Sequence, residues 1–328
     1  MIKNQSNRFF RFCCYFPLFF LSSSANGMVK NHTLPYAVQR TAPEMTHPLD
    51  TLTEWFSDCK VIRNGYKSVF GKYPNLKNPT TFSEKIAYKR LYDRRAILTQ
   101  IADKIHVRNF VESRIGSKYL QTIYQIAKTP EEIDWDSLPS QFVLKTNHGS
   151  GWNIIVHNKN TLDIKEATSK LKYWLNTNYY NYTREWCYKH IPPVVFVEKL
   201  LLDDQGKIPT DWKFFVFSGH ALYIQVNINR FEYNQCNIYD RNLKKMGVRY
   251  HWDNFSADLV FPPNIEEMFT LAEQLGEGFD FVRVDLYNVN GRIFFGELTN
   301  YPLAGFAPFT PDKFDKQLGD CWSVPARY

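Results

Sequence analysis

Two carboxylates on either side of a short turn are the residues of this chain best suited to chemistry. Asp285 and Glu297 each stand in a run rich in β-branched and aromatic residues, and the two runs flank Asn290-Gly291. Such a dipeptide between apolar runs predicts a β-hairpin. A carboxylate in a largely buried strand is costly unless a cation pairs with it. Arg283 is one candidate partner, because it lies on the same face of its strand as Asp285, and a divalent cation is the other.

The length of the turn decides whether the two carboxylates cooperate. A loop of only Asn290 and Gly291 places Asp285 and Glu297 on opposite faces of the hairpin. A three-residue loop, 289–291, places both on one face as diagonal neighbours, about 7–8 Å apart, with Arg283 opposite Glu297. Two carboxylates at that separation can hold Mg²⁺ together with water and phosphate. An Arg–carboxylate network that joins two strands fits the same residues, so the pattern leaves both interpretations open.

A glycine-rich loop forms a second constellation. Residues 141–146 and 153–156 have strand character, and His148-Gly149-Ser150-Gly151 lies between them, shortly after Lys145. Glycines allow backbone N–H groups to approach an anion closely. The loop is neither a Walker loop nor a Rossmann fingerprint, because a strand follows it. A flexible hairpin over phosphates and a turn that simply needs glycine both remain open.

Three further segments place charged side chains on predicted elements. Glu198-Lys199-Leu200 ends a buried-type strand, and Lys213 lies on the first strand of a hairpin predicted at 211–226. Lys104 lies in a helix predicted at 95–114 by the spacing of its apolar residues. Charged residues at such positions either contact ligands or mark the surface of the protein.

A capping box predicts where one helix begins. Thr81-Phe82-Ser83-Glu84 has the required spacing of a threonine and a glutamate. The basic residues of that helix are expected along one of its sides. They are Lys85, Lys89, Arg90 and Arg94.

In chain order, these signals resemble the ATP-grasp superfamily and, more closely, the TupA-like ATP-grasp family of bacterial polysaccharide and teichuronopeptide biosynthesis. The resemblance covers residues 66–319. It implies an α+β protein with an ATP-grasp fold, in which two α+β subdomains grip ATP and follow an N-terminal helical region. The stretches that carry it are N-P-T-T-F-S-E-K-I, Q-F-V-L-K-T-N-H-G-S-G, R-E-W-C-Y-K, D-W-K-F-F-V-F-S-G and F-V-R-V-D-L-Y-N-V-N-G-R-I-F-F-G-E-L-T.

The resemblance also implies roles for the candidate residues. Lys213 would reach phosphate, and Arg283 would stabilise the transferred phosphoryl group. Asp285 and Glu297 would bind Mg²⁺, with Thr299 as a further ligand where many ATP-grasp ligases have asparagine. Trp152 departs from the family pattern, because a small residue is common there. The residues implied to bind ATP are Lys104, Lys145, His148, Gly149, Ser150, Gly151, Glu198, Lys199 and Leu200.

The activity implied by the resemblance is ATP- and Mg²⁺-dependent ligation of a carboxylate to an amine. The carboxylate would form an acyl phosphate with release of ADP, and the amine would then displace phosphate to give an amide. The expected partners are an acidic glycan or glycan precursor, such as a uronic acid of a capsule or cell-wall polysaccharide, and an amine or amino acid. The residues themselves identify neither substrate.

Two other functions compete with this one. Asp134-Trp135-Asp136 has the D-x-D form that binds the metal of a nucleotide-sugar in glycosyltransferases, although it lies in a polar connection. Residues 179–186 hold aromatic side chains and an arginine, which a carbohydrate-binding module could use. The second alternative leaves Lys145, Lys213 and the two carboxylates unexplained.

Composition limits the choice of partners and compartments. The chain has 328 residues, 44% of them hydrophobic, and a net charge of +7. The positive charge is spread along the chain, which favours an anionic small substrate and argues against a nucleic-acid partner. The six cysteines form no C-x-x-C pair and no Cys/His cluster with zinc spacing. The four cysteines beyond the N-terminal segment are expected to be reduced thiols.

The N-terminal segment differs from the rest of the chain. Basic residues precede an apolar run at 12–21 and small residues follow it, which is typical of a signal peptide. A start at Met28 and a loose anchor on a membrane surface are the alternatives. Because the implied chemistry uses ATP, we expect a cytoplasmic protein that can associate with the inner membrane surface. The predicted organisation is a leader at 1–27, a linker at 28–58, a helical region at 59–135, a small subdomain with the glycine-rich flap at 136–205 and a C-terminal subdomain at 206–328.

Overall fold

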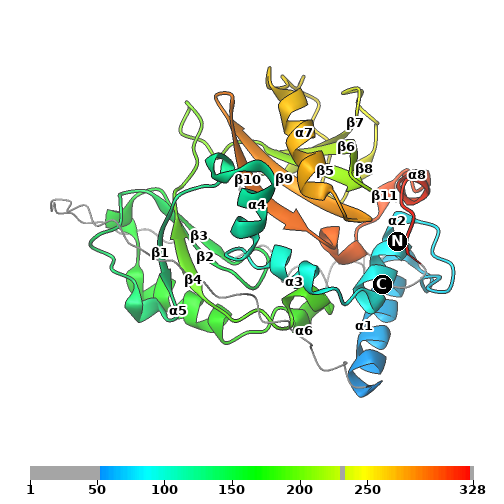
Figure 1. Ribbon diagram of the computed structural model, residues 1–328, viewed down its shortest axis with the longest axis horizontal. Helices are drawn as coiled ribbons and strands as arrows, with labels where there is room; N and C mark the ends of the chain where they lie inside the picture. The colour runs from blue at the N-terminus through cyan, green and yellow to red at the C-terminus, as the bar shows by residue number, and fades with distance from the viewer. Residues whose placement is uncertain (1–51, 230–232, 326–328) are drawn as a thin grey trace, which may run out of the picture. The chain divides into compact units, whose positions relative to one another are not determined.

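The computed structural model describes residues 52–229 and 233–325, which form two compact units (Figure 1). The smaller unit comprises Thr122–Asn178 and Pro193–Leu200, and the larger unit comprises the other described residues. The chain therefore leaves the larger unit and returns to it twice. The leader predicted at 1–27 and most of the linker predicted at 28–58 lie outside the described residues.

The smaller unit is built on an antiparallel sheet of four strands, in the order β1-β4-β2-β3. Leu144 of the sheet and Leu171 of its main helix are fully buried in the same hydrophobic cluster. The elements of this unit are β1 (Ile123–Ala127), η2 (Pro130–Glu132), β2 (Phe142–Thr146), β3 (Asn153–Val156), η3 (Lys159–Thr161), α5 (Ile164–Leu175) and β4 (Val195–Glu198).

The larger unit is built on an antiparallel sheet of five strands, in the order β10-β9-β5-β6-β7, and a small two-stranded sheet. Its strands are β5 (Asp211–Phe217), β6 (His220–Ile228), β7 (Gln235–Asp240), β8 (Arg249–Tyr250), β9 (Phe281–Val289), β10 (Arg292–Thr299) and β11 (Phe309–Thr310). Its helices are α1 (Leu52–Phe70), α2 (Phe82–Tyr92), α3 (Ala96–Ala102), α4 (Val107–Ile115), η1 (Ser117–Tyr119), α6 (Tyr180–Thr183), η4 (Trp186–Tyr188), α7 (Ile265–Gly276), η5 (Pro302–Gly305) and α8 (Lys313–Asp320).

The two faces of the five-stranded sheet have different environments. On one face, the rings of Phe214 in β5 and Phe269 in α7 lie 4.9 Å apart, and Figure 1 shows α7 lying along this sheet. Side chains alternate along a strand, so Phe215 and Phe281 point to the other face. There Phe281 packs against Phe82 of α2, with ring centroids 5.0 Å apart. Only part of this second face is aromatic, and the rest carries charged side chains.

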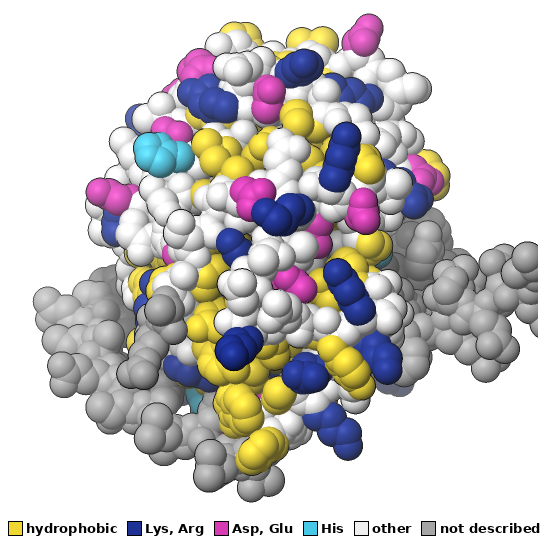
Figure 2. Space-filling model, turned by 90° about the vertical axis from the view of Figure 1, so that its right-hand side faces the viewer, with side chains coloured by type: hydrophobic (Ala, Val, Ile, Leu, Met, Phe, Trp, Pro, Cys, Tyr) yellow, Lys and Arg dark blue, Asp and Glu magenta, His cyan; other side chains and the backbone are white. Residues whose placement is uncertain are grey.

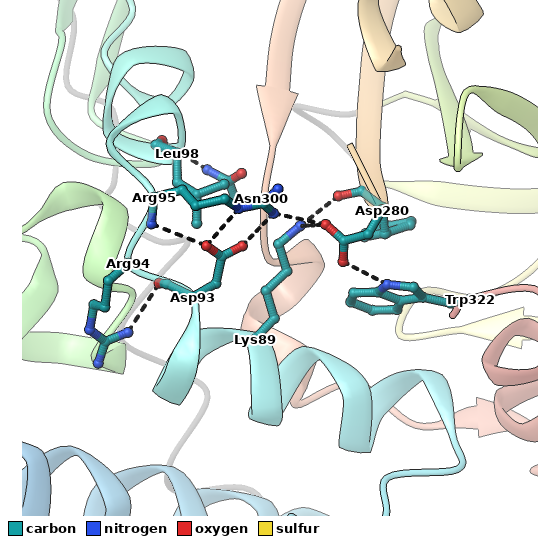
Figure 3. A network of polar contacts seen from close by, with 9 residues as sticks. Lys89, Asp93, Arg94, Arg95, Leu98, Asp280, Asn300 and Trp322 are labelled. Carbon is teal, nitrogen blue, oxygen red and sulfur yellow. Dashed lines mark hydrogen bonds and ion pairs between the residues drawn. The ribbon is translucent and has the colours of Figure 1, made fainter. Parts of the chain in front are cut away.

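Helix α2 joins the start of β9 through a buried polar network (Figure 3). Lys89 of α2 donates to the backbone oxygen of Phe281 at 2.7 Å and forms an ion pair with Asp280 at 3.3 Å. Arg95 and the indole of Trp322 also donate to Asp280, at 2.9 and 2.7 Å. The network fixes the residue that directly precedes the strand carrying the candidate site.

The capping box predicted for α2 is confirmed, and two of the basic residues of this helix have buried structural partners. Thr81 and Glu84 form both hydrogen bonds of the box. Lys89 and Arg90, however, are fully buried, and Arg90 donates to the backbone oxygen of Ala304 at 2.7 Å. These cations anchor α2 to the rest of the unit, because their partners lie far away in the sequence.

The helix predicted at 95–114 is in fact two helices, α3 and α4. The Asp103 side chain accepts hydrogen bonds from the backbone N–H groups of Ile105 and His106, at 2.9 and 3.3 Å. Such a side chain competes with the helical backbone and ends the first helix. Lys104 therefore lies in a turn.

Two further elements can be placed within the predicted organisation. Helix α1 begins at Leu52, inside the segment predicted to be a linker, and β1 is a strand within the region predicted to be helical. None of the helices at 52–229 and 233–325 combines the length and the apolar character that crossing a bilayer requires. The described cysteines, Cys59, Cys187, Cys236 and Cys321, are free thiols.

The β9–β10 hairpin has the shorter of the two turns considered from the sequence, and a bulge changes its register. Arg292 pairs with Val289, so the loop is Asn290-Gly291. The expectation that this turn separates the carboxylates is nevertheless wrong. Beyond Phe295 the register shifts by one residue, and Glu297 pairs directly with Asp285. The extra residue is Gly296, and it brings both carboxylates to one face.

Gly296 sits where the two strands approach each other closely. A Cβ atom added there would lie 2.9 Å from the backbone oxygen of Asp285 and 3.2 Å from the ring of Tyr287. A real Cβ does not fit at 2.9 Å from a backbone atom, so the bulge in this form requires glycine.

We predict that Gly296→Ala destabilises the larger unit by about 1–3 kcal/mol, because the strand must move to admit the methyl group. Urea unfolding monitored by circular dichroism measures this loss. Gly291→Asn is the control in the same hairpin, since no atom lies within 4 Å of an added Cβ there and asparagine tolerates the left-handed conformation. Equal losses in the two variants would contradict the role given to the bulge.

Candidate functional site

A row of charged residues crosses three strands of the larger unit. Lys213 of β5 pairs with Asp285 of β9, and Asp285 pairs with Glu297 of β10. Directly paired residues of antiparallel strands point to the same face. We call Lys213, Asp285 and Glu297 the charged row.

Asp285 is the centre of this row. Its two carboxylate oxygens accept hydrogen bonds from Nε and Nη2 of Arg283, each at 2.7 Å. Lys213 Nζ donates to Oδ2 of the same carboxylate at 2.6 Å, and lies 3.4 Å from a carboxylate oxygen of Asp211. Arg283 and Lys213 thus hold Asp285 in a fixed orientation by charge-assisted hydrogen bonds.

Glu297 and Thr299 extend the cluster along β10. Glu297 Oε1 accepts hydrogen bonds from Arg283 Nη2 at 3.1 Å and from the Thr299 hydroxyl at 3.0 Å. Thr299 also accepts a hydrogen bond from Arg283 at 3.0 Å, so its hydroxyl lies within the cluster. The next residue, Asn300, instead donates to the backbone oxygen of Leu98 at 3.0 Å. The structure therefore favours Thr299 over Asn300 as a candidate ligand.

Burial is uneven across the charged row. The Asp285 side chain is 3% exposed, whereas that of Glu297 is 37% exposed, so solvent reaches the row at its β10 end. Burial alone would lower the pKa of Arg283, but the charge of Asp285 and the hydrogen bonds to it raise that pKa above its usual value. Arg283 therefore stays protonated, as stabilisation of an anion requires.

The residues of the cluster fit a divalent cation of the Mg²⁺ type. They offer carboxylate oxygens from two paired positions and a threonine hydroxyl, which are the hard oxygen ligands that Mg²⁺ prefers. Residues 52–229 and 233–325 contain no group of three or more His, Cys, Asp or Glu side chains that could hold a metal ion. Mg²⁺ often binds through one or two carboxylates and completes its shell with water and substrate phosphates. Asp285, Glu297 and Thr299 match this sparse arrangement.

We predict that Asp285→Ala and Glu297→Ala differ strongly in stability. Asp285→Ala leaves Arg283 and Lys213 buried without their main partner, which should cost about 3–5 kcal/mol. Glu297→Ala removes a partly exposed partner and should cost about 0–1 kcal/mol. Urea unfolding of both variants measures the difference, and similar losses would show that Asp285 does not hold the cluster together.

The smaller unit holds a separate group of candidate residues around the glycine-rich loop. Lys145 of β2 forms an ion pair with Glu198 of β4, and both lie on one face of the sheet. His148 is buried, and its Nε2 lies 3.1 Å from the backbone oxygen of Trp174 in α5. The Asn147 side chain accepts a hydrogen bond from the backbone N–H of Val194 at 2.8 Å. The start of the glycine-rich loop thus contacts α5 and the residue that directly precedes β4.

Trp152 packs directly over the glycine-rich loop. A Cβ atom on Gly149 would lie 2.4 Å from the Trp152 ring, so glycine is needed at this position. The Trp152 ring is parallel to that of Trp174, with centroids 6.4 Å apart, and makes an edge contact with His148 at 5.2 Å. The large residue that departs from the family pattern therefore covers the loop and packs on its own unit.

This contact predicts a non-additive pair of substitutions. Gly149→Ala should destabilise the smaller unit because the new methyl group displaces Trp152, and Trp152→Ala should cost stability through lost packing. In the double variant the methyl group has space, so the combined loss should be smaller than the sum by about 0.5–3 kcal/mol. Urea unfolding of the wild type, the two single variants and the double variant gives the coupling free energy between the two positions. Losses that simply add would contradict this contact.

The remaining candidates for ATP binding lie in separate places. Lys199 is exposed, and its backbone N–H donates to the backbone oxygen of Thr122 at 2.9 Å. Leu200 is buried. Lys104 belongs to the larger unit and lies in the turn after α3. Burial raises the pKa of Cys187, and the charge of Lys104 partly opposes this shift. The role of Lys104 in ATP binding stays a prediction.

Glu185 is a buried carboxyl group that was given no role from the sequence. Burial raises its pKa, the charge of Arg90 opposes this shift, and the charge of Glu297 adds to it. Glu185 therefore lies within electrostatic range of the charged row. Its place in R-E-W-C-Y-K was the available signal, but a carboxylate in a short aromatic stretch does not indicate which strand it approaches.

The residues behind the two alternative functions have structural roles. Asp134 lies in an exposed turn, where its carboxylate accepts a hydrogen bond from the Ser137 backbone at 3.4 Å. In the aromatic stretch 179–186, Tyr180 and Trp186 are buried. These stretches contribute turn formation and packing.

The chain belongs to the TupA-like ATPgrasp family, whose profile matches residues 84–323. The match contains every candidate residue of both units. The α+β class and the ATP-grasp fold predicted from the sequence are thereby confirmed. No curated protein sequence matches the chain.

Several solved structures are similar to parts of the chain. D-alanine–D-alanine ligase from Bacillus anthracis, complexed with ATP, is 15% identical with a TM-score of 0.35, over 62% of this chain and 55% of that one. L-amino acid ligase from Bacillus licheniformis is 14% identical with a TM-score of 0.39, over 63% and 44%. N5-carboxyaminoimidazole synthase from Aspergillus clavatus, in complex with ADP and 5-aminoimidazole ribonucleotide, is 14% identical with a TM-score of 0.36, over 71% of this chain and 54% of that one. The chain thus spans about half the length of each.

Proposed function

We propose that this protein is an ATP- and Mg²⁺-dependent ligase that joins a carboxylate to an amine through an acyl phosphate. The observation that carries the proposal is the charged row with Arg283, found in a chain of the TupA-like ATPgrasp family. A buried cluster of two cations and paired carboxylates is suited to binding and transferring a phosphoryl group.

The first step of the proposed reaction joins two anions. An oxygen of the substrate carboxylate attacks the γ-phosphorus of ATP, the bond to the bridging oxygen breaks, and ADP leaves with the electron pair. Lys213 and Arg283 would offset the negative charge of the transferred group, and the proposal is supported by their position beside each other, since both donate to Oδ2 of Asp285. Mg²⁺ held by Asp285, Glu297 and Thr299 would supply further charge neutralisation and orient the phosphates.

In the second step, the amine nitrogen attacks the acyl carbon. The bond from carbon to the phosphate oxygen breaks, inorganic phosphate leaves, and the nitrogen loses a proton to give the amide. Water competes with the amine for the acyl phosphate, so its exclusion is part of catalysis. Burial of Lys213, Asp285 and Arg283 supports this requirement.

The proposed carboxylate substrate is a uronic acid of an acidic surface glycan or its precursor, and the proposed amine is an amino acid or amino sugar. The net charge of +7 is complementary to such an acidic substrate. On the face drawn in Figure 2, Lys and Arg side chains border exposed hydrophobic side chains. Phe56, Tyr73 and Tyr92 are among the exposed aromatic residues of the α1–α2 region. A cytoplasmic protein that can lie against an anionic membrane surface fits these features.

The first experiment measures binding of nucleotides by thermal shift. We expect ATP with Mg²⁺ to raise the melting temperature of the wild-type protein, and Glu297→Ala to lose most of the part of this shift that depends on Mg²⁺. Glu297 is chosen because its replacement should leave the fold largely intact. Stabilisation by a UDP-sugar and not by ATP would contradict the proposal and favour a glycosyltransferase, with Asp134 and Asp136 as the residues to test.

A further inference from the structure

The polar face of the larger sheet continues beyond the charged row onto β6. Gln225 pairs with Lys213, and Asn227 pairs with Asp211, so all four side chains share one face. Gln225 is 1% exposed and Asn227 is 2% exposed. Two buried amides therefore lie on the neighbouring strand, opposite the residues proposed to handle phosphate.

Hydrogen bonds fix the orientation of the Gln225 amide. Its Nε2 donates to Asn227 Oδ1 at 2.7 Å, and Asn227 Nδ2 in turn donates to Asn234 Oδ1 at 3.0 Å. The Gln225 carbonyl oxygen is left at the end of this chain of amides. Within the described part of the protein, this buried oxygen has no hydrogen-bond partner. A buried acceptor without a donor is costly, so such an atom calls for a ligand.

The charges around Gln225 indicate what kind of ligand it would accept. Lys213 and Arg283 face three carboxyl groups, those of Asp211, Asp285 and Glu297. The groups that suit Mg²⁺ lie toward β10, whereas Asp211 and Gln225 lie on the β5–β6 side of the row. One carboxylate and one amide carbonyl form a poor metal site but match the several N–H donors of an ammonium group.

We propose that Asp211 and Gln225 form the subsite for the amine substrate, with Asn227 holding the Gln225 carbonyl toward it. This inference rests on the proposed ligase function and adds the place where the nucleophile binds. Gln225 pairs with Lys213, and Lys213 pairs with Asp285, so only Lys213 stands between this subsite and Asp285. The amine would therefore lie next to the residues proposed to hold the acyl phosphate. A primary amine or ammonium group, and not a particular amino acid, is the chemistry these two residues recognise.

The test uses methylammonium chloride as the probe, with the full-length protein and Mg²⁺-ADP present. Saturation-transfer NMR detects the methyl signal of the bound probe and gives its dissociation constant by titration. Tetramethylammonium chloride is the matched control, because it has the same charge and no N–H donor. We expect methylammonium to bind and tetramethylammonium to bind more weakly. Equal signals from the two cations would overturn the subsite.

Substitutions then locate the binding. Gln225→Leu removes the carbonyl and should weaken methylammonium binding about 10–150-fold, the effect of one hydrogen bond to a charged group. Gln235→Leu, on the adjacent strand β7, is the matched control and should leave binding unchanged. Gln225→Glu places a carboxylate in the same position and should tighten binding, which keeps the test decisive if the leucine variant does not fold. Unchanged affinity in both Gln225 variants would overturn the assignment.

A thermal shift with Mg²⁺-ATP on the same proteins separates this inference from the function on which it rests. If ATP stabilises the protein and methylammonium binding does not depend on Gln225, the subsite is wrong and the ligase proposal stands. If ATP gives no stabilisation, the ligase proposal fails, and the assignment of an amine substrate to this subsite fails with it.

Discussion

One extra residue in β10 determines whether Glu297 and Asp285 lie on the same face of the sheet. Side chains alternate along a strand, so the two-residue turn at Asn290-Gly291 would by itself send Asp285 and Glu297 to opposite faces. The bulge at Gly296 shifts the register once and pairs them directly. The place of Glu297 in the charged row follows from this shift, as does the approach of Thr299 to Arg283. The position tolerates only glycine because the backbone of the neighbouring strand lies against it.

The charges of the site also stabilise the structure that carries them. Asp285 accepts from both Arg283 and Lys213, and these three side chains are almost completely buried. None of them could be buried alone without a large desolvation penalty. A site assembled in this way is oriented before any substrate arrives, which would lower the reorganisation that the proposed phosphoryl transfer requires. The same arrangement means that loss of activity in an Asp285 variant would not by itself demonstrate a role in metal binding.

Local sequence patterns predicted those features whose causes lie within a few residues. The hairpin, the capping box at Thr81 and the strands around the glycine-rich loop depend on adjacent residues, and all three are present. The two-residue turn was one of the two alternatives for the hairpin, but neither alternative contained the bulge, although a lone glycine inside a strand pattern was a signal for one. Burial of Lys89 could not be predicted from its helix, because its partner Asp280 is 191 residues away. Gln225 also gave no signal, since its significance depends on which strand lies beside it.

The ion pair between Lys89 and Asp280 has a consequence for the order in which the chain can fold. During synthesis, α2 leaves the ribosome long before Asp280 exists, while the chain between them includes all described residues of the smaller unit. The smaller unit can therefore complete its sheet as soon as residue 200 is available. Two fully buried cations of α2, Lys89 and Arg90, must meanwhile remain in water or in temporary contacts until β9 and the C-terminal segment arrive. Domains generally fold in the order in which they are made, and here α2 must be among the last elements to reach its native position.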